Sequence, residues 1–133
     1  MPTFSRVSQE KLSTCHPDLQ KVVNEVIKIY DITVIEGARS YEDQRKYYEL
    51  GRSKTMNSKH LVQPDGYAHA VDLAPYPVDF DNKQRFAYMA GLMIGIGKQM
   101  GIQITWGHDW DSDGDFDEHA FKDSPHFELR NIR

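Results

Sequence analysis

The stretch GYAHAVDLAP, residues 66–75, decides the fold that the sequence predicts. From Ala68 to Ala74 it is short and apolar, which is typical of a buried strand. Pro75 and Pro77 end this strand, because proline cannot donate a hydrogen bond to a ladder. Upstream, residues 52–66 are polar and contain the turn signal Pro64-Asp65-Gly66, so we expect a long loop before the strand.

Helices are predicted before and after this strand in the sequence. Apolar residues recur at helical spacing over 17–30, and Pro17 suits the first position of a helix. Ser40 can cap a shorter helix from Tyr41 to about Leu50, and a second long helix is expected over 82–101. Further strands are predicted over 32–36, 102–106 and 125–129, with an acidic loop over 108–124. The sum is an α+β fold: one domain, residues 1–133, with a mostly antiparallel sheet and helices on one face.

Composition narrows the class of protein. The chain has 133 residues, 39% of them hydrophobic and 27% charged, as in an ordinary globular domain. The net charge of -4 and the lack of a basic stripe argue against nucleic-acid binding. No apolar run has the length of a signal peptide or a membrane span, so we expect synthesis in the cytoplasm without export and without membrane insertion. We also expect the protein to be a monomer. The single Cys15 rules out an intrachain disulfide.

Ligand-type side chains gather in three short segments: SKH (58–60), HAVD (69–72) and DSPH (123–126). A catalytic zinc site needs three protein ligands and an open position, and His60, Asp72 and His126 would supply that set. Taken singly, each has an ordinary alternative: a solvated loop residue, a turn cap and a sheet histidine. His69 and Asp72 would face opposite sides of a strand, so His69 is expected to be a packing or outer residue.

Asp123 is the predicted catalytic base. It lies three residues before His126, so a turn between them would hold its carboxylate beside the metal without using it as a ligand. Zinc acidifies a water molecule, and the carboxylate can accept the proton as that water attacks a carbonyl carbon. Arg39 could share in stabilising the oxyanion, or it could form a surface salt bridge with Glu36 or Glu42.

Several of these segments resemble one known family. GARSYEDQ (37–44), SKH (58–60), GYAHAVDLAP (66–75), WGHDW (106–110) and DSPHFEL (123–129) are similar, in this order, to the LAS-type zinc peptidases. That group includes VanY-type D-alanyl-D-alanine carboxypeptidases and the phage L-alanyl-D-glutamate peptidase endolysins. The opening FSRVSQEKLSTCHPDLQKVV makes the phage endolysins the closest likeness.

The resemblance implies roles for particular positions. It assigns zinc to His60, Asp72 and His126, and the base to Asp123. It also implies that Arg39, Gln44 and Ser58 touch substrate, while Trp106 is either a wall of the substrate cleft or a core anchor. One departure concerns spacing: the common signature separates its His and Asp by seven residues, whereas His60 and Asp72 are twelve apart, so residues 62–67 must include a loop expansion.

The function implied is hydrolysis of the L-alanyl-D-glutamate bond in the peptidoglycan stem peptide, with a holin opening the membrane to deliver the enzyme to the wall. A D,D-carboxypeptidase is the close alternative, but it would more naturally carry a secretion signal. A non-catalytic, metal-containing wall-binding module is the third reading, although such a module has no use for Asp123.

The acidic loop carries aspartates at alternate positions, which resemble the first part of an EF-hand. We expect either a regulatory calcium site or a solvated loop. The twelfth position of the motif is Ala120 instead of glutamate, so a complete EF-hand is excluded. The calcium ligands would be Asp109, Asp111, Asp113, Asp115 and Asp117.

Overall fold

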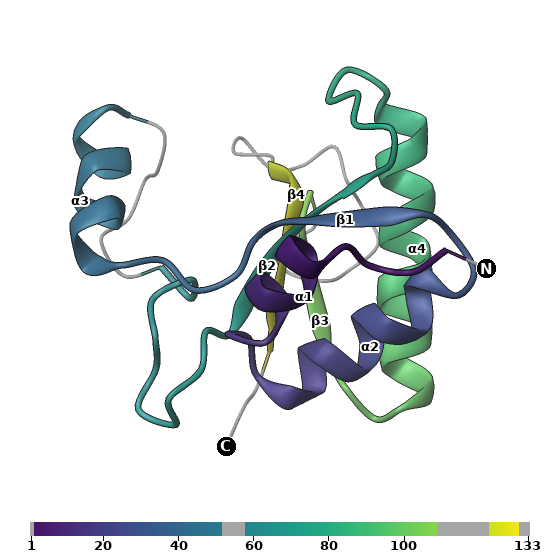
Figure 1. The fold of residues 1–133 in the computed structure, drawn as a ribbon, viewed down its shortest axis with the longest axis horizontal. Coiled ribbons are helices and arrows are strands. Elements are labelled where there is room, and N and C mark those ends of the chain that lie inside the picture. The colour runs from purple at the N-terminus through teal and green to yellow at the C-terminus, as the bar shows by residue number, and fades with distance from the viewer. Residues whose placement is uncertain (1, 52–57, 109–122, 131–133) are drawn as a thin grey trace.

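A computed structural model describes residues 2–51, 58–108 and 123–130, in which helices and strands are interspersed along the chain (Figure 1). The elements in order are α1 (Arg6–Leu12), α2 (Pro17–Ile27), β1 (Ile32–Glu36), α3 (Tyr41–Glu49), β2 (Ala70–Pro75), α4 (Lys83–Gln99), β3 (Ile104–Gly107) and β4 (Asp123–Leu129).

The four strands form one antiparallel sheet in the order β1-β2-β4-β3. This confirms the predicted α+β class. The final strand is not at the edge: β4 lies between β2 and β3, so the two segments that carry Asp72 and His126 are direct neighbours. Strands β2 and β4 are therefore the elements that build the candidate site.

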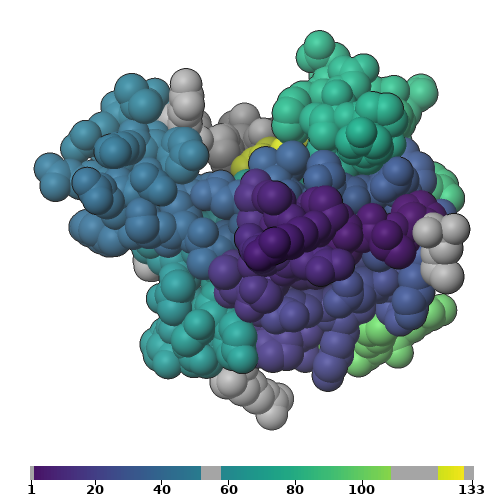
Figure 2. Space-filling model, in the orientation of Figure 1, coloured from purple at the N-terminus to yellow at the C-terminus, as the bar shows by residue number. Residues whose placement is uncertain are grey.

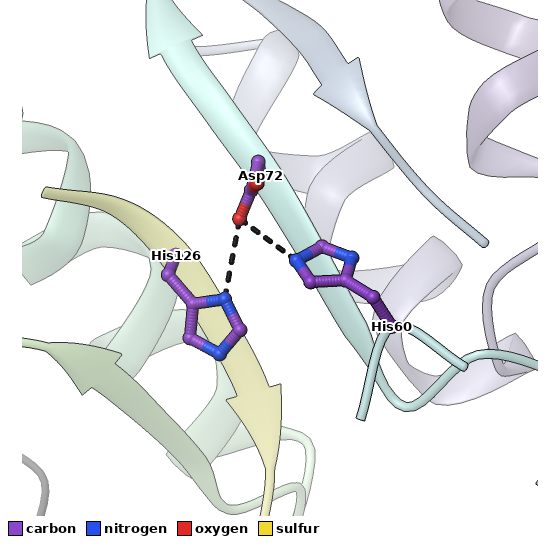
Figure 3. Close-up of side chains that lie close together, drawn as sticks. All are labelled: His60, Asp72 and His126. Atoms are coloured by element: carbon purple, nitrogen blue, oxygen red, sulfur yellow. Dashed lines mark hydrogen bonds and ion pairs between the residues drawn. The ribbon is translucent and has the colours of Figure 1, made fainter. Parts of the chain in front are cut away.

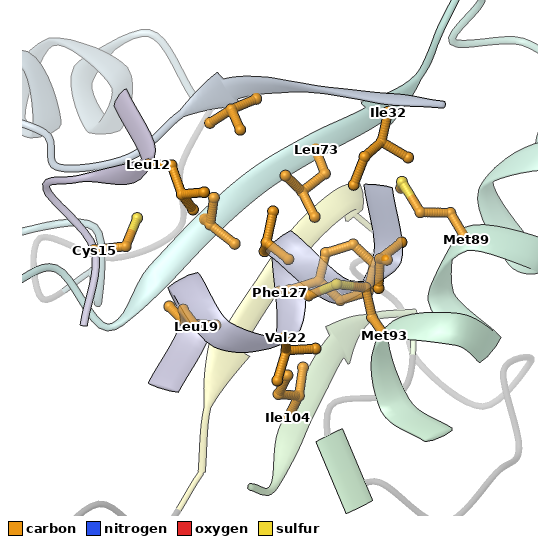
Figure 4. Packing of buried hydrophobic residues seen from close by; sticks show 14 of the residues in the cluster. Leu12, Cys15, Leu19, Val22, Ile32, Leu73, Met89, Met93, Ile104 and Phe127 are labelled. Atoms are coloured by element: carbon orange, nitrogen blue, oxygen red, sulfur yellow. The ribbon is translucent and has the colours of Figure 1, made fainter. Parts of the chain in front are cut away.

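The hydrophobic core lies between the sheet and helices α2 and α4 (Figure 4). Because side chains alternate along a strand, Val71 and Leu73 of β2 and Phe127 and Leu129 of β4 all enter this core. Asp72 and His126 occupy the intervening positions, so they belong to the opposite face. One face of these strands thus packs in the core, and the other presents the polar side chains of the candidate site.

Local capping explains where the helices begin. The Ser40 side chain accepts a hydrogen bond from the backbone N–H of Asp43 at the start of α3, as the sequence predicted. At the start of α2, the His16 ring nitrogen Nδ1 accepts a hydrogen bond from the backbone N–H of Asp18, and Pro17 is the first helical residue. Helix α2 ends three residues earlier than predicted, at Ile27.

Helix α1 was not predicted. It has seven residues, too few for a clear helical period, and its N-cap Ser5 is a weak signal by itself. Its buried side chains are Ser8 and Leu12, and Leu12 joins the core. The Ser8 hydroxyl accepts a hydrogen bond from the Val34 backbone N–H at 3.2 Å, which ties α1 to β1.

Helix α3 projects from the rest of the protein, at the left of Figure 1. In Figure 2 the yellow of β4 is visible between α3 and the segment that precedes α4. None of the described helices is both long and apolar enough to cross a lipid bilayer.

Candidate metal centre

Three side chains from separate segments converge on one point (Figure 3). Asp72 Oδ1 lies 3.0 Å from His60 Nε2 and 3.2 Å from His126 Nδ1. All three ligand-type atoms lie within 4.8 Å of one another, and both histidines are buried. The structure thus brings together the trio proposed from sequence, including His60, whose spacing from Asp72 is unusual.

Sheet register places two of the three. Asp72 and His126 are direct partners across the β2–β4 ladder, so their side chains lie side by side on the same face. On the other side of β2, an irregularity after Val34 makes Glu36 the partner of Asp72. Asp72 is therefore flanked by a histidine on one neighbouring strand and a carboxylate on the other.

His60 comes from a loop and is held by the segment that follows β1. Its Nδ1 lies 2.8 Å from the Gly37 carbonyl oxygen, and its own carbonyl accepts from the Arg39 backbone N–H at 2.7 Å. Gly37 must be glycine, because a Cβ there would lie 2.2 Å from the Lys11 carbonyl oxygen and 2.4 Å from the Thr14 hydroxyl oxygen. The end of α1 thus supports, through Gly37, the orientation of His60.

His126 is held from its other side by an acidic residue. Its Nε2 lies 2.8 Å from Glu128 Oε1, and Lys59 Nζ lies 3.2 Å from Glu128 Oε2. Sequence reasoning missed Glu128 and Lys59. The available signal was the period of two along β4, which puts residue 128 on the same face as His126.

The donor set fits a metal ion. The Gly37 carbonyl and the Glu128 carboxylate lie where they can accept N–H groups from His60 Nδ1 and His126 Nε2. With those nitrogens protonated and the rings neutral, as metal ligation requires, the lone pairs are directed toward Asp72. Two imidazole nitrogens and one carboxylate oxygen then converge, and such acceptors need a cation between them. This combination of nitrogen and oxygen ligands suits zinc.

Electrostatics agree with a strongly anionic Asp72. In the metal-free protein, burial by itself would raise the pKa of Asp72, but hydrogen bonds from His126 and His60 outweigh it and hold that pKa well below its usual range. Burial would likewise lower the pKa of His126, yet its contacts with Asp72 and Glu128 raise it to about 9 in the metal-free protein. In the absence of a metal, a proton on His126 therefore serves as the cation.

Asp123 lies at the start of β4 beside this trio. If the β3–β4 register continued from Trp106, Gly107 would face His126; it faces Asp123 instead, so residues 124–126 form a bulge. The predicted turn between Asp123 and His126 is therefore an irregularity inside a strand. Gly107 permits this close pairing, because a Cβ there would lie 2.1 Å from the Asp123 carbonyl oxygen.

The environment of the Asp123 carboxylate differs from that of Asp72. Burial raises the pKa of Asp123, and the negative charge of Asp72 raises it further, while interactions with His126, His60 and Arg39 oppose this. A carboxylate with a raised pKa is a stronger base than an ordinary aspartate, which suits proton transfer.

Arg39 forms the salt bridge weighed from sequence, and its role toward an oxyanion stays a prediction. Its guanidinium forms two hydrogen bonds with Glu36, at 2.8 and 2.7 Å, which is the salt bridge alternative. The same group lies 4.0 Å from Asp72 Oδ2 and donates to Gln44 Oε1 at 2.6 Å. Arg39 also lies over the ring of Tyr47. Glu36 thus holds the guanidinium beside the candidate metal centre.

The residues predicted to touch substrate are placed differently from one another. Gln44 is fully buried beneath Arg39, and Trp106 is 3% exposed, with its indole N–H donating to the Ser124 carbonyl oxygen. Their positions lend no support to direct substrate contact. Ser58 accepts a hydrogen bond from the His60 backbone N–H through its hydroxyl, so it shapes the loop that presents His60.

His69 stays outside the trio, as expected. Its Nε2 lies 2.7 Å from Asp65 Oδ2, and this contact lowers the pKa of Asp65. Its ring also packs edge-on against His16. The predicted calcium ligands Asp109, Asp111, Asp113, Asp115 and Asp117 lie outside the described residues, and that site stays a prediction.

Comparison with known proteins first gives the class. The chain is 28% identical over 137 residues to the L-alanyl-D-glutamate peptidase of Escherichia phage T5, covering 95% of this chain and 96% of that protein. It is 27% identical over 111 residues to the peptidoglycan L-alanyl-D-glutamate endopeptidase CwlK of Bacillus subtilis, covering 74% of this chain and 60% of the relative.

A solved structure of a similarly named peptidase has the same fold as this chain. The L-Ala D-Glu endopeptidase ChiX of Serratia marcescens matches with a TM-score of 0.77 and 30% identity, over 96% of this chain and 90% of that one. All three relatives are peptidases. The model of the phage L-alanyl-D-glutamate peptidase family matches residues 2–130, and the chain therefore belongs to that family.

Proposed function

We propose that this protein is a zinc-dependent endopeptidase that hydrolyses the L-alanyl-D-glutamate bond of the peptidoglycan stem peptide. The observation that carries the proposal is the buried convergence of His60, Asp72 and His126, with the Asp123 carboxylate beside them. Family membership supports the choice of bond, since the relatives from phage T5, B. subtilis and S. marcescens are named for it.

The residues of this chain divide the chemistry between them. Zinc bound by His60, Asp72 and His126 would polarise a carbonyl group and acidify a water molecule. Asp123 accepts the proton of the attacking water and returns a proton to the leaving amine, which its raised pKa favours. Arg39, held by Glu36, places a fixed positive charge where the tetrahedral oxyanion develops.

The substrate would approach the site from the side on which β4 is visible in Figure 2. Strand β4, which carries both Asp123 and His126, is seen there between α3 and the segment before α4. A peptide lying near α3 would meet Arg39 beside the site, because Arg39 immediately precedes the N-cap of α3. For a phage lysin, a holin would open the membrane and give the enzyme access to the wall.

The test is digestion of purified peptidoglycan, followed by identification of the new chain ends. We expect new amino-terminal D-glutamate and free L-alanine carboxylate, with about one zinc ion per chain in the active preparation. Release of terminal D-alanine would assign the protein to the D,D-carboxypeptidases. Binding to the wall without new termini would make it a wall-binding module. His126→Ala is the matched inactive variant, and it should lose the metal.

A further inference from the structure

A second carboxylate, that of Glu128, lies on the same face of β4 as His126 but has no part in the chemistry described above. Its two oxygens face different partners: Oε1 lies 2.8 Å from His126 Nε2, and Oε2 lies 3.2 Å from Lys59 Nζ. The Glu128 side chain is 19% exposed, so solvent screens these contacts only in part. One carboxylate thus connects a candidate metal ligand with a lysine.

The lysine comes from the segment that carries the other histidine. Lys59 immediately precedes His60, and its ammonium group also donates to the Leu129 carbonyl oxygen at the end of β4. Glu128 lies two residues after His126 on the same strand. The Lys59–Glu128 pair therefore joins the two histidine-bearing segments, which are far apart in the sequence, next to the point where their rings converge.

The chemical effect of Glu128 falls on one nitrogen of His126. A carboxylate that accepts the Nε2 proton keeps that nitrogen protonated, which leaves the lone pair of a neutral ring on Nδ1. Nδ1 is the nitrogen that faces Asp72. A negative charge hydrogen-bonded to the ring also makes the ligating nitrogen more basic.

We propose that Glu128 is a positioning residue that fixes the metal-binding tautomer of His126, and that Lys59 holds Glu128 in place while it links the His60 loop to β4. This inference rests on the proposed metal site, because it assigns to Glu128 and Lys59 a function toward a cation held by His60, Asp72 and His126. Neither residue touches the substrate or the reacting atoms.

The first test measures zinc affinity by competition with a chromophoric chelator. Glu128→Gln keeps the size of the side chain but removes its charge, and we expect zinc affinity to fall by about 10–100-fold. The matched control is Glu25→Gln, which removes the charge from a surface pair whose Glu25 Oε1 lies 2.9 Å from Lys28 Nζ. The control should bind zinc as the wild type does.

The second test reports the tautomer directly. In ¹⁵N spectra of the zinc-loaded wild type, the His126 Nε2 proton should be visible and protected from exchange. In Glu128→Leu, which has no acceptor, this proton should exchange with solvent. A role confined to overall stability would leave both the zinc affinity and this resonance of the folded variants unchanged.

The part played by Lys59 is tested by a double-mutant cycle. Lys59→Met keeps the aliphatic chain and removes the charge, and Lys28→Met is its control. If Lys59 acts through Glu128, the loss of zinc affinity in the combined Lys59→Met/Glu128→Gln variant should be smaller than the two single losses together. Fully additive losses would contradict the link between the two residues.

Different results would overturn the proposed function and the positioning role of Glu128. A wild-type protein that binds no zinc would overturn the proposed function. Stoichiometric zinc in the wild type, with unchanged affinity and an unchanged Nε2 resonance in folded Glu128→Gln and Glu128→Leu, would overturn only the positioning role.

Discussion

Asp72 and Asp123 belong to one candidate site, but their surroundings shift the pKa values of their carboxyl groups in opposite directions. In the metal-free protein, hydrogen bonds from two imidazole rings keep Asp72 ionised, whereas burial and the charge of Asp72 raise the pKa of Asp123. Environments that separate the pKa values of two carboxyl groups usually mark two different roles. Asp72 is thus suited to hold a cation and Asp123 to carry a proton.

Replacing the base should separate metal binding from catalysis. We expect Asp123→Asn to retain zinc, because Asp123 is not among the three converging ligands. Its kcat should fall by about 10²–10⁴-fold, the usual effect of losing a general base. The measurement pairs zinc content by elemental analysis with turnover on a stem peptide; near-normal turnover would exclude Asp123 as the base.

The stability of the metal-free protein should depend on the protonation of His126. Its pKa is raised from 6.5 in the unfolded chain to about 9 in the folded protein, so the stabilisation is fully present below about pH 6.5 and is lost as pH rises through about 9. That difference in pKa corresponds to a contribution of about 3 kcal/mol to the free energy of unfolding of the metal-free protein.

Urea unfolding of the chelator-treated protein between pH 6 and pH 9 measures this loss. His126→Gln should lack this component of the pH dependence, and so should the zinc-loaded wild type, because zinc replaces the proton. Equal pH dependence in wild type and His126→Gln would show that His126 is not the titrating group.

For individual residues of the candidate metal site, the sequence predicts which side chains come together but not which contacts orient them. The joint presence of ligand-type residues in three short segments pointed to His60, Asp72 and His126. The contacts of Gly37, Lys59 and Glu128 depend on tertiary neighbours, which spacing does not reveal.

Among the elements, the expanded loop between His60 and β2 closes on itself. Val62 and Ala68 form an antiparallel bridge, and the backbone N–H of Gln63 donates to the Tyr67 carbonyl oxygen at 2.9 Å. The tip of the loop also contacts His16 through Asp65. The expansion is therefore a small hairpin that projects from an otherwise short connection.

Deleting residues 63–67 should leave the metal site intact. Paired residues across antiparallel strands have Cα atoms about 4.5–5.5 Å apart, close to the 3.80 Å of consecutive residues, so Val62 can be joined to Ala68 with little movement. We expect zinc affinity within about tenfold of the wild type, a margin of about 1.4 kcal/mol. Loss of zinc from a folded deletion variant would show that the hairpin is needed to place His60.

The elements themselves were mostly predictable, and the exceptions have physical causes. Amphipathic periods and β-branched runs located α2, α4 and β1 to within a few residues. Helix α1 was missed because most of its support is tertiary, through Ser8 and Leu12. The bulge in β4 was missed because register depends on the partner strand.

For the molecule as a whole, Cys15 offers a probe of global opening. It is the only cysteine in the sequence, it is fully buried in the core, and its Sγ contacts the Ala70 carbonyl oxygen. Burial raises the pKa of this thiol to about 12, so almost no reactive thiolate is present at neutral pH.

Labelling by an aromatic disulfide reagent should therefore require unfolding of the whole core. We expect no reaction in the native protein on a timescale of minutes, and immediate reaction in denaturant. The labelling rate should rise with urea in parallel with global unfolding measured by tryptophan fluorescence. Rapid labelling without denaturant would show that the segment around Cys15 opens locally.

The central place of β4 in the sheet links activity to the order of synthesis. A nascent chain that stops before Asp123 has β1 and β2 able to pair, but β3 has no partner, because it contacts the sheet only through β4. Such a chain also lacks Asp123 and His126. A ribosome that stalls before this point therefore releases a polypeptide with neither a complete sheet nor the candidate metal centre.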